Sequence, residues 1–253
     1  MTQRALSCWR RATLSALLAA AFCTALPAQA GDVTLDFDDV GYGFLGAGDS
    51  FDYMGLQLTA TSGIGDAEQG DLVGAVFDGN DPAMCMRLSC PVDNHTPGYY
   101  AGLNDGALVI SGPGAGLQVK SFDASFIGAF ERNGMIEYYP EVAGLLEVRG
   151  FAADGSYQSE RFVLKGPYPV GTDFYMAHFE TSAAFASQNF TSIAFFAYSC
   201  DLDGNCAAFN DNSGQFALDN LQLGVSAVPE PSSGLMLLGG LGAIAAVRRR
   251  RSA

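Results

Sequence analysis

Between residues 31 and 224 the sequence contains only short apolar runs, and none of them is convincing as a helix. Residues 33–37 (VTLDF) alternate apolar and polar side chains, as a half-buried strand does. Further β-type runs, separated by Gly, Asp and Asn, occupy residues 56–61, 72–77, 107–110, 117–130, 190–198 and 215–223. Many short strands with turn signals between them predict an all-β fold, an antiparallel β-sandwich of the jelly-roll type.

One hairpin is the clearest local prediction. Residues 145–152 and 157–164 are strand-like runs joined by Ala153-Asp154-Gly155-Ser156. The Asp-Gly pair supplies the positive φ that a tight turn requires. Residues 79–97, in contrast, are rich in Asp, Pro, Cys and Asn, and we expect them to form a long loop held by a disulfide.

The first thirty residues have the pattern of a secretory signal peptide. Three arginines precede an apolar segment at residues 12–26, and the small-x-small sequence Ala-Gln-Ala ends at Ala30. We expect signal peptidase to cut between Ala30 and Gly31 after export by the general secretion machinery. The remaining length is that of a single domain, at residues 31–224.

The last part of the chain, residues 225–253, combines three features in a fixed order. Pro229-Glu230-Pro231 is a stiff tripeptide, because each proline fixes its own φ and restricts the residue before it. An uncharged apolar run follows, predicted to form a single membrane-spanning helix and including Leu235, Leu237, Leu238, Leu241 and Ile244. Four arginines then stay on the cytoplasmic side by the positive-inside bias: Arg248, Arg249, Arg250 and Arg251.

This tail resembles the PEP-CTERM sorting signal of Gram-negative bacteria that secrete exopolysaccharide. The resemblance implies that exosortase, a membrane-embedded cysteine protease, recognises the tail in the inner membrane and removes it near Pro229-Glu230-Pro231. It also implies a final location at the cell surface or outside the cell. A plain C-terminal membrane anchor is the alternative. Gln215-Phe216-x-x-Asp219 resembles a motif found in a group of uncharacterised exported proteins that carry this tail.

Charge is distributed unevenly along the chain. Seven of the 13 Lys and Arg residues lie in the two end segments, whereas 26 of the 27 Asp and Glu residues lie between them. The exported domain therefore has six cationic residues against 26 acidic ones, a net charge of −20. Such a surface repels nucleic acids and anionic lipids, which excludes nucleic-acid binding, but it attracts cations such as calcium.

Four cysteines remain in the domain as two close pairs, Cys85 with Cys90 and Cys200 with Cys206. Each pair brackets a turn-rich stretch, and the compartment is oxidising, so we expect two local disulfides. A zinc site is the alternative. It is disfavoured because neither spacing is Cys-x-x-Cys and the two histidines of the domain are not adjacent.

Calcium is the one cofactor that the carboxylates suggest. Asp36 and Asp38 follow the first predicted strand, and Asp219 lies in the last. The first and last strands are neighbours in many jelly rolls, so these three side chains could supply several of the six to eight oxygens that calcium binds. The alternative is that Asp219 accepts backbone hydrogen bonds at a bulge. Asp201-x-Asp203-Gly204-Asn205 resembles the opening of a calcium loop, but a disulfide-bounded turn explains it better.

No catalytic site is complete in the sequence, and we expect no enzyme. Gly48-Asp49-Ser50 resembles the nucleophile block of GDSL-type hydrolases. Those enzymes place their histidine in an Asp-x-x-His context, which neither His95 nor His178 has. A secreted hydrolase therefore stays a minor alternative.

The acidic, lectin-like sandwich leads us to expect an association with exopolysaccharide in the biofilm matrix. Exposed tyrosines would stack on sugar rings, and adjacent strand residues face opposite ways. One member of each pair Tyr99-Tyr100 and Tyr138-Tyr139 is therefore expected at the surface, although core aromatics are the commoner case. A purely structural surface protein with no specific ligand is the alternative.

Overall fold

β-Strands dominate the regular structure in this computed structural model. It describes residues 31–65, 67–81, 83–85, 88–92, 97–112, 116–128, 130–132, 135–137, 142–166, 173–210 and 212–226. Within these residues the helix α2 (Ala183–Ala186) is a single turn, capped by Ser182. Residues 30–226 form one compact unit, and the domain expected at residues 31–224 falls inside it.

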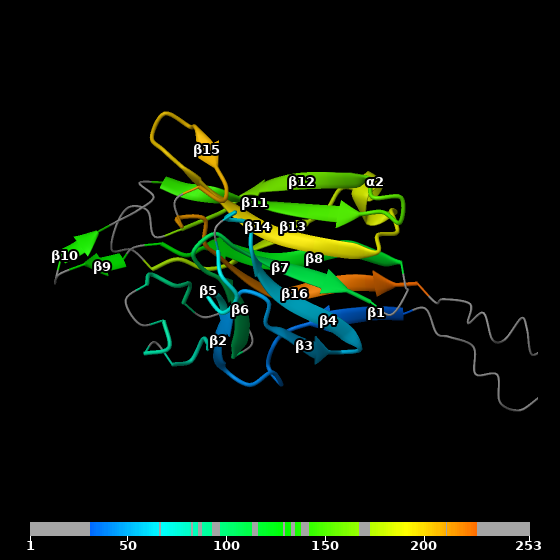
Figure 1. The fold of residues 1–253 in the computed structure, drawn as a ribbon, viewed down its shortest axis with the longest axis horizontal. Helices are drawn as coiled ribbons and strands as arrows, with labels where there is room; N and C mark the ends of the chain where they lie inside the picture. Colours follow the sequence, from blue (N-terminus) through cyan, green and yellow to red (C-terminus); the bar gives the residue numbers. More distant parts are fainter. Residues whose placement is uncertain are drawn as a thin grey trace, which may run out of the picture. The chain divides into compact units, whose positions relative to one another are not determined.

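One seven-stranded sheet is built around β16, and we call it the β16 sheet (Figure 1). Its strand order is β13-β8-β16-β6-β5-β2, and β1 also pairs with β16, so the first and last strands are neighbours. The strands are β1 (Gly31–Leu35), β2 (Gly43–Gly46), β5 (Leu72–Asp78), β6 (Gly98–Gly102), β8 (Leu117–Phe126), β13 (Ala177–Glu180) and β16 (Phe216–Val225).

The second seven-stranded sheet, the β14 sheet, has the order β12-β11-β14-β7-β4-β3, with β15 paired to β14. Its strands are β3 (Ser50–Tyr53), β4 (Leu56–Ser62), β7 (Gly106–Ser111), β11 (Val142–Phe151), β12 (Tyr157–Val163), β14 (Ser192–Cys200) and β15 (Cys206–Ala207). A separate two-stranded ribbon consists of β9 (Phe130–Arg132) and β10 (Met135–Glu137). All these pairings are antiparallel, which confirms the predicted all-β antiparallel sandwich.

The main core lies between the two sheets because side chains alternate along each strand. In β14, Ile193, Phe195 and Ala197 point into this core, while Ala194 and Phe196 belong to a separate cluster on the outer face. Phe122 of β8 meets Phe195 edge to face, with ring centroids 5.6 Å apart. Aromatic pairs of this kind add roughly 0.5–1.5 kcal/mol beyond the area that they bury.

The outer face of the β16 sheet is also buried, and this corrects one expectation. Phe77, Tyr99 and neighbouring alanines form a second apolar cluster, packed against Met84, Leu88 and Cys90 of the loop after β5. Tyr99 and Tyr100 are therefore both buried, although they face opposite ways. A tyrosine on an outward-facing strand position is exposed only if nothing covers that face. Tyr138 and Tyr139 lie outside the described residues.

Local sequence signals located the long strands well. The predicted hairpin is β11 and β12, and Gly155 in its turn has the expected positive φ of 83°. The strands that sequence reasoning missed are short: β2, β3, β6 and β13 have four or five residues each, β9 and β10 have three, and β15 has two. β2 (GFLG) and β6 (GYYAG) are also rich in glycine, which weakens any strand signal.

Both predicted disulfides, Cys85–Cys90 and Cys200–Cys206, are present. The signal peptide through Ala30, the Pro-Glu-Pro segment, the apolar tail and the arginine block lie outside the described residues. Within the described part of the chain, no helix has the length and apolar character needed to cross a membrane.

The start of β7 depends on a glycine. A Cβ added at Gly106 would lie 1.8 Å from the carbonyl oxygen of Val73 in β5. We predict that Gly106→Ala lowers the free energy of unfolding by about 2–4 kcal/mol, because the backbone must move apart to admit the methyl group. Urea denaturation measures this change.

Gly41→Ala is the matched control, because an added Cβ there has no neighbour within 4 Å. Its effect should stay within about 0.5 kcal/mol. Equal stability of the two variants would contradict the close approach of β5 and β7.

Candidate functional site

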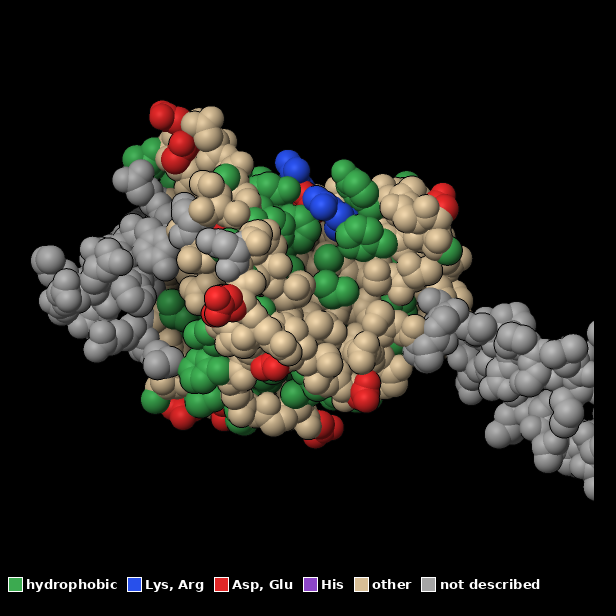
Figure 2. Space-filling view, viewed as in Figure 1, with side chains coloured by type: hydrophobic (Ala, Val, Ile, Leu, Met, Phe, Trp, Pro, Cys, Tyr) green, Lys and Arg blue, Asp and Glu red, His purple; other side chains and the backbone are tan. Residues whose placement is uncertain are grey.

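The outer face of the β14 sheet carries an unusual group of side chains on three adjacent strands. Strand register places Glu147 of β11 between Arg161 of β12 and Phe196 of β14. Arg149 lies two residues further along the same face. We call this group, together with Phe209 from the segment after β15, the arginine–aromatic face, consisting of Glu147, Arg149, Phe151, Tyr157, Arg161, Phe196, Tyr198 and Phe209. Figure 2 shows Lys and Arg side chains beside hydrophobic ones over β11 and β12.

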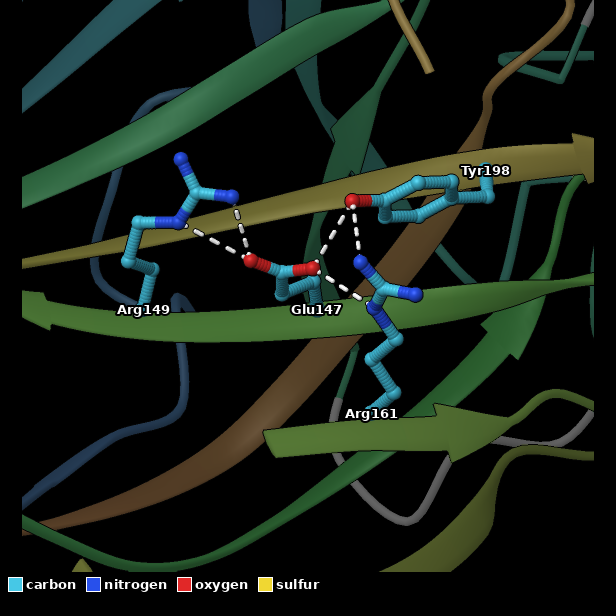
Figure 3. A network of polar contacts seen from close by, with 4 residues as sticks. All are labelled: Glu147, Arg149, Arg161 and Tyr198. Carbon is cyan, nitrogen blue, oxygen red and sulfur yellow. Dashed lines mark hydrogen bonds and ion pairs between the residues drawn. The ribbon is translucent and has the colours of Figure 1, made fainter. Parts of the chain in front are cut away.

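Glu147 is fully buried and is the centre of a hydrogen-bonded network (Figure 3). Its Oε1 accepts from Nε and Nη2 of Arg149, at 2.9 and 2.5 Å. Its Oε2 accepts from Nε of Arg161 and from the hydroxyl of Tyr198, both at 2.8 Å. Arg161 Nη2 also donates to the Tyr198 hydroxyl, at 3.0 Å. Such charge-assisted bonds are the strong ones, and they stabilise a charge that burial alone would penalise.

These contacts control protonation in the network. Burial acts to raise the pKa of Glu147, but the hydrogen bonds from Arg161, Tyr198 and Arg149 outweigh it, so the pKa of this carboxyl is lowered. Burial and the hydrogen bond to Glu147 raise the pKa of Tyr198. The hydrogen bond to Glu147 raises the pKa of Arg161. At neutral pH the network therefore holds one carboxylate, two guanidinium ions and a neutral phenol.

Aromatic rings also contact both guanidinium groups. The Arg149 guanidinium carbon lies 4.7 Å from the ring centroid of Tyr157 and 4.9 Å from that of Phe196. The Arg161 guanidinium carbon lies 4.6 Å from the ring centroid of Tyr198. Cation–π contacts at these distances are worth roughly 0.5–2 kcal/mol and fix the orientation of the planar group.

Acidic side chains are nearly absent from this face. Among the outward-facing positions of β12, β11, β14, β7, β4 and β3, only Glu147 and Asp52 are acidic. Three carboxylates lie in the turns at its ends, of which Asp203 is exposed and the other two are bound within their turns. Asp154 accepts from Ser156, and Asp201 accepts from Asn205. In a domain with 26 acidic residues, this face differs from the average surface because its arginines outnumber its carboxylates.

A cavity of about 470 Å³ is the other candidate binding place. It lies between the start of β11 and the segment before β13. Its lining includes Leu164, Lys165, Asp173, Phe174 and Tyr175. Tyr175 is 53% exposed, so this cavity also offers an accessible aromatic ring.

The predicted calcium ligands each accept a hydrogen bond from a neighbouring group of the chain, and calcium binding by them stays a prediction. Asp36 accepts from the Tyr53 hydroxyl at 2.5 Å, and Asp38 accepts from the backbone N–H of Gly98 at 2.9 Å. Asp219 is fully buried and accepts from the backbone N–H of Asn220, at a register shift in β16. Among the described residues, no group of three or more His, Cys, Asp or Glu side chains could hold a metal ion.

The Gln215-Phe216-x-x-Asp219 motif has structural roles. Gln215 is buried and donates to the carbonyl of Ile127 at 3.5 Å. Phe216 fills the space above Gly102, where any Cβ would collide with its ring. Sequence reasoning missed a further residue, Asp105, which accepts from the backbone N–H groups of residues 210, 212 and 214 and so holds the loop before β16.

The structure separates the side chains that resembled hydrolase residues. Ser50 lies in β3, an edge strand of the β14 sheet, whereas His178 lies in β13, an edge strand of the β16 sheet. His178 instead contacts Asp123, with 2.7 Å between Nδ1 and Oδ1. His95 lies outside the described residues.

Sequence reasoning also missed the arginine–aromatic face, although a signal was present. In the predicted hairpin, Glu147, Arg149 and Phe151 occur at every second position of one strand, and Tyr157 and Arg161 occur in step on the other. That spacing puts each set on one face of its own strand. The predicted strand ends, with Ala152 opposite Tyr157, would have paired Glu147 with Phe162, whereas the structure pairs Glu147 with Arg161.

The fold and this face define an all-β sandwich with an open, basic and aromatic surface. Residues 227–251 match the family model described as PEP-CTERM protein-sorting motif. The chain thus carries the PEP-CTERM tail of an exosortase substrate, which implies export and a surface or extracellular location. No curated protein matches the chain in sequence.

Three solved structures show a distant likeness. A DUF4465 family protein from Bacteroides caccae has 11% identity and a TM-score of 0.47, covering 76% of this chain and 98% of its own. A tandem CBM22 domain of Paenibacillus barcinonensis Xyn10C has 10% identity and a TM-score of 0.31, with coverage of 81% and 48%. An agarase, AgWH50C, has 12% identity and a TM-score of 0.29, with coverage of 78% and 25%.

Acid should weaken the fold through Glu147. The lowered pKa means that its ionised form stabilises the folded protein above the ordinary value of 4.5, and that this contribution is lost as the pH falls through the folded-state pKa. We predict that Glu147→Gln lowers the free energy of unfolding at neutral pH by about 2 kcal/mol. This is less than for a wholly buried pair because Arg161 is partly exposed.

The difference between wild type and Glu147→Gln should shrink as the pH falls below about 4.5, measured by urea denaturation at a series of pH values. Glu160→Gln is the control, since Glu160 accepts only from the backbone amide and hydroxyl of Ser182 on the other side of β12. Its cost should be about 1 kcal/mol or less. A Glu147→Gln difference that is constant with pH would refute the assigned ionisation.

Proposed function

We propose that this chain is a non-enzymatic, exported binding protein that associates with exopolysaccharide through the arginine–aromatic face. After processing near Pro229-Glu230-Pro231, a lectin-like sandwich would stay with the matrix polysaccharide at the cell surface. The carrying observation is an open sheet face with both aromatic rings and fixed hydrogen-bond donors. The tail directs the sorting of the protein, and the arginine–aromatic face provides the proposed binding activity.

Two properties of the face support a sugar ligand. Tyr157 is 58% exposed and offers its phenol ring at the rim, where the apolar side of a pyranose can pack. Arg161 is also exposed, and its guanidinium group is already held in place by Glu147 and Tyr198. Binding to such a preorganised surface costs little side-chain entropy.

The charge of the domain supports this choice over other partners. A net charge of −20 disfavours nucleic acids and anionic membranes as ligands. The main apolar clusters are buried. Among the described residues, the exposed large aromatic side chains are Tyr157 on the arginine–aromatic face, Tyr175 at the cavity, Tyr42 just before β2 and Phe44 within β2. Of these places, the arginine–aromatic face is the one with guanidinium groups held in position by hydrogen bonds.

Retention of the processed protein on immobilised exopolysaccharide from the producing cells tests the proposal. We predict that wild type is retained and that Tyr157→Ala weakens the interaction about tenfold, the effect of losing a contact worth about 1.4 kcal/mol. Tyr175→Ala is the matched control, because Tyr175 is similarly exposed but lines the cavity.

The two variants separate the possible outcomes. Loss of retention with Tyr175→Ala and not with Tyr157→Ala would move the site to the cavity and contradict the proposal. No retention of folded wild type would indicate a purely structural surface protein instead. Near-ultraviolet circular dichroism should confirm that each variant is folded.

A further inference from the structure

The charge of the arginine–aromatic face points to a particular class of polysaccharide. Resting on the function proposed above, we infer that the ligand is an anionic polysaccharide of the uronate type, whose carboxylates bind the guanidinium groups of Arg149 and Arg161. Neutral glucans would then be poor ligands. Two observations carry this inference, an unbalanced positive charge and unused donors, and the acidity of the rest of the domain restricts an anionic chain to this face.

The network at Glu147 holds one positive charge in excess. Two guanidinium ions share a single carboxylate, and the Tyr198 phenol stays neutral because its pKa is raised. A second carboxylate would complete the pairing. The sheet does not supply one, because Glu147 and Asp52 are the only acidic residues among the outward-facing positions of its six main strands, and Asp52 lies on the far edge strand, β3.

Each guanidinium group also keeps unused donors. Arg149 uses Nε and Nη2 for Glu147, and Arg161 uses Nε and Nη2 for Glu147 and Tyr198. Within the described residues, Nη1 of either arginine makes no hydrogen bond, and Figure 3 shows both Nη1 atoms on the sides away from Glu147. These N–H groups are fixed by the network, so they suit a carboxylate that arrives from solvent.

The rest of the domain discriminates by repulsion. With a net charge of −20, most of its surface rejects an anionic chain, so such a chain can bind productively only where the local sign is reversed. A uronate polymer presents a carboxylate on each sugar and an apolar ring face beside it. The arginine–aromatic face presents the complementary groups, guanidinium ions next to the exposed ring of Tyr157.

Affinity measurements with matched polymers test the inference. Polygalacturonate, its fully methyl-esterified form and dextran are titrated into the processed protein in the presence of EDTA. Polygalacturonate should bind at least about tenfold more tightly than the methyl ester, which has the same backbone without the charge. Raising the ionic strength should weaken polygalacturonate binding selectively, because salt screens the exposed charges.

A pair of charge-matched variants locates the effect. Arg161→Gln should weaken polygalacturonate binding about tenfold, while Glu147 keeps its bonds to Arg149 and Tyr198. Lys120→Gln makes the same change in net charge, but Lys120 pairs with Asp32 in the other sheet, so its binding should change less than about twofold. If Arg161→Gln fails to fold, Arg149→Gln provides the second measurement with the same expectation.

Each of the remaining outcomes would contradict one specific claim of the proposal. Equal binding of polygalacturonate and its methyl ester would overturn the anionic ligand, while the proposed polysaccharide function would stand. Binding that requires calcium in place of EDTA, or equal effects of Arg161→Gln and Lys120→Gln, would overturn the role of the arginines. Binding of poly-L-glutamate as tight as that of polygalacturonate would indicate that the ligand is an acidic polypeptide and not a glycan. No binding to any glycan, including the cells' own exopolysaccharide, would overturn the proposed function itself.

Discussion

Burial of the Glu147 carboxylate is the constraint on which the open face of this protein depends. A charged group without exposed surface must be paired, because the cost of removing it from water is several kcal/mol. Three side chains on three adjacent strands donate hydrogen bonds to this carboxylate: Arg149, Arg161 and Tyr198. The same contacts hold the two guanidinium carbons within 4.9 Å of aromatic ring centroids, so a requirement of folding also organises a surface.

The two outer faces of the sandwich differ in a way that bears on function. The β16 sheet is covered on its outer side by the loop that contains Cys85 and Cys90, so that Phe77 and Tyr99 are core residues. The β14 sheet also buries Phe196 on its outer side, but it exposes Arg161 and Tyr157, and Tyr157 is the most accessible of the rings in that group.

Much of the fold could be predicted from local patterns. The β-branched and aromatic composition of 190–198 and the Asp-Gly turn at Gly155 are local signals, and they predicted β14 and the β11–β12 hairpin. The short strands β2 and β6 escaped prediction because GFLG and GYYAG hold little alternation and much glycine. Pairing with longer neighbours stabilises them, and that information is not local.

The functional site was harder to predict because it depends on strand register. Asp36 and Asp219 do lie near neighbouring strands, as expected, and they accept hydrogen bonds from Tyr53 and Asn220 that the sequence did not indicate. The partners of Glu147 come from positions 2, 14 and 51 residues away. Only the correct register of β12, β11 and β14 brings them together, and it can be read with certainty only from the fold.

The most direct test of the account is an NMR titration of the processed protein with trigalacturonate, following the arginine Nε–H signals. The account predicts that the signals of Arg149 and Arg161 shift together and saturate with one affinity. It also predicts that the Tyr157 ring resonances move with them. Saturable shifts confined to residues near Tyr175, or no shift of either arginine while the sugar binds, would contradict the claim that this network is the binding site.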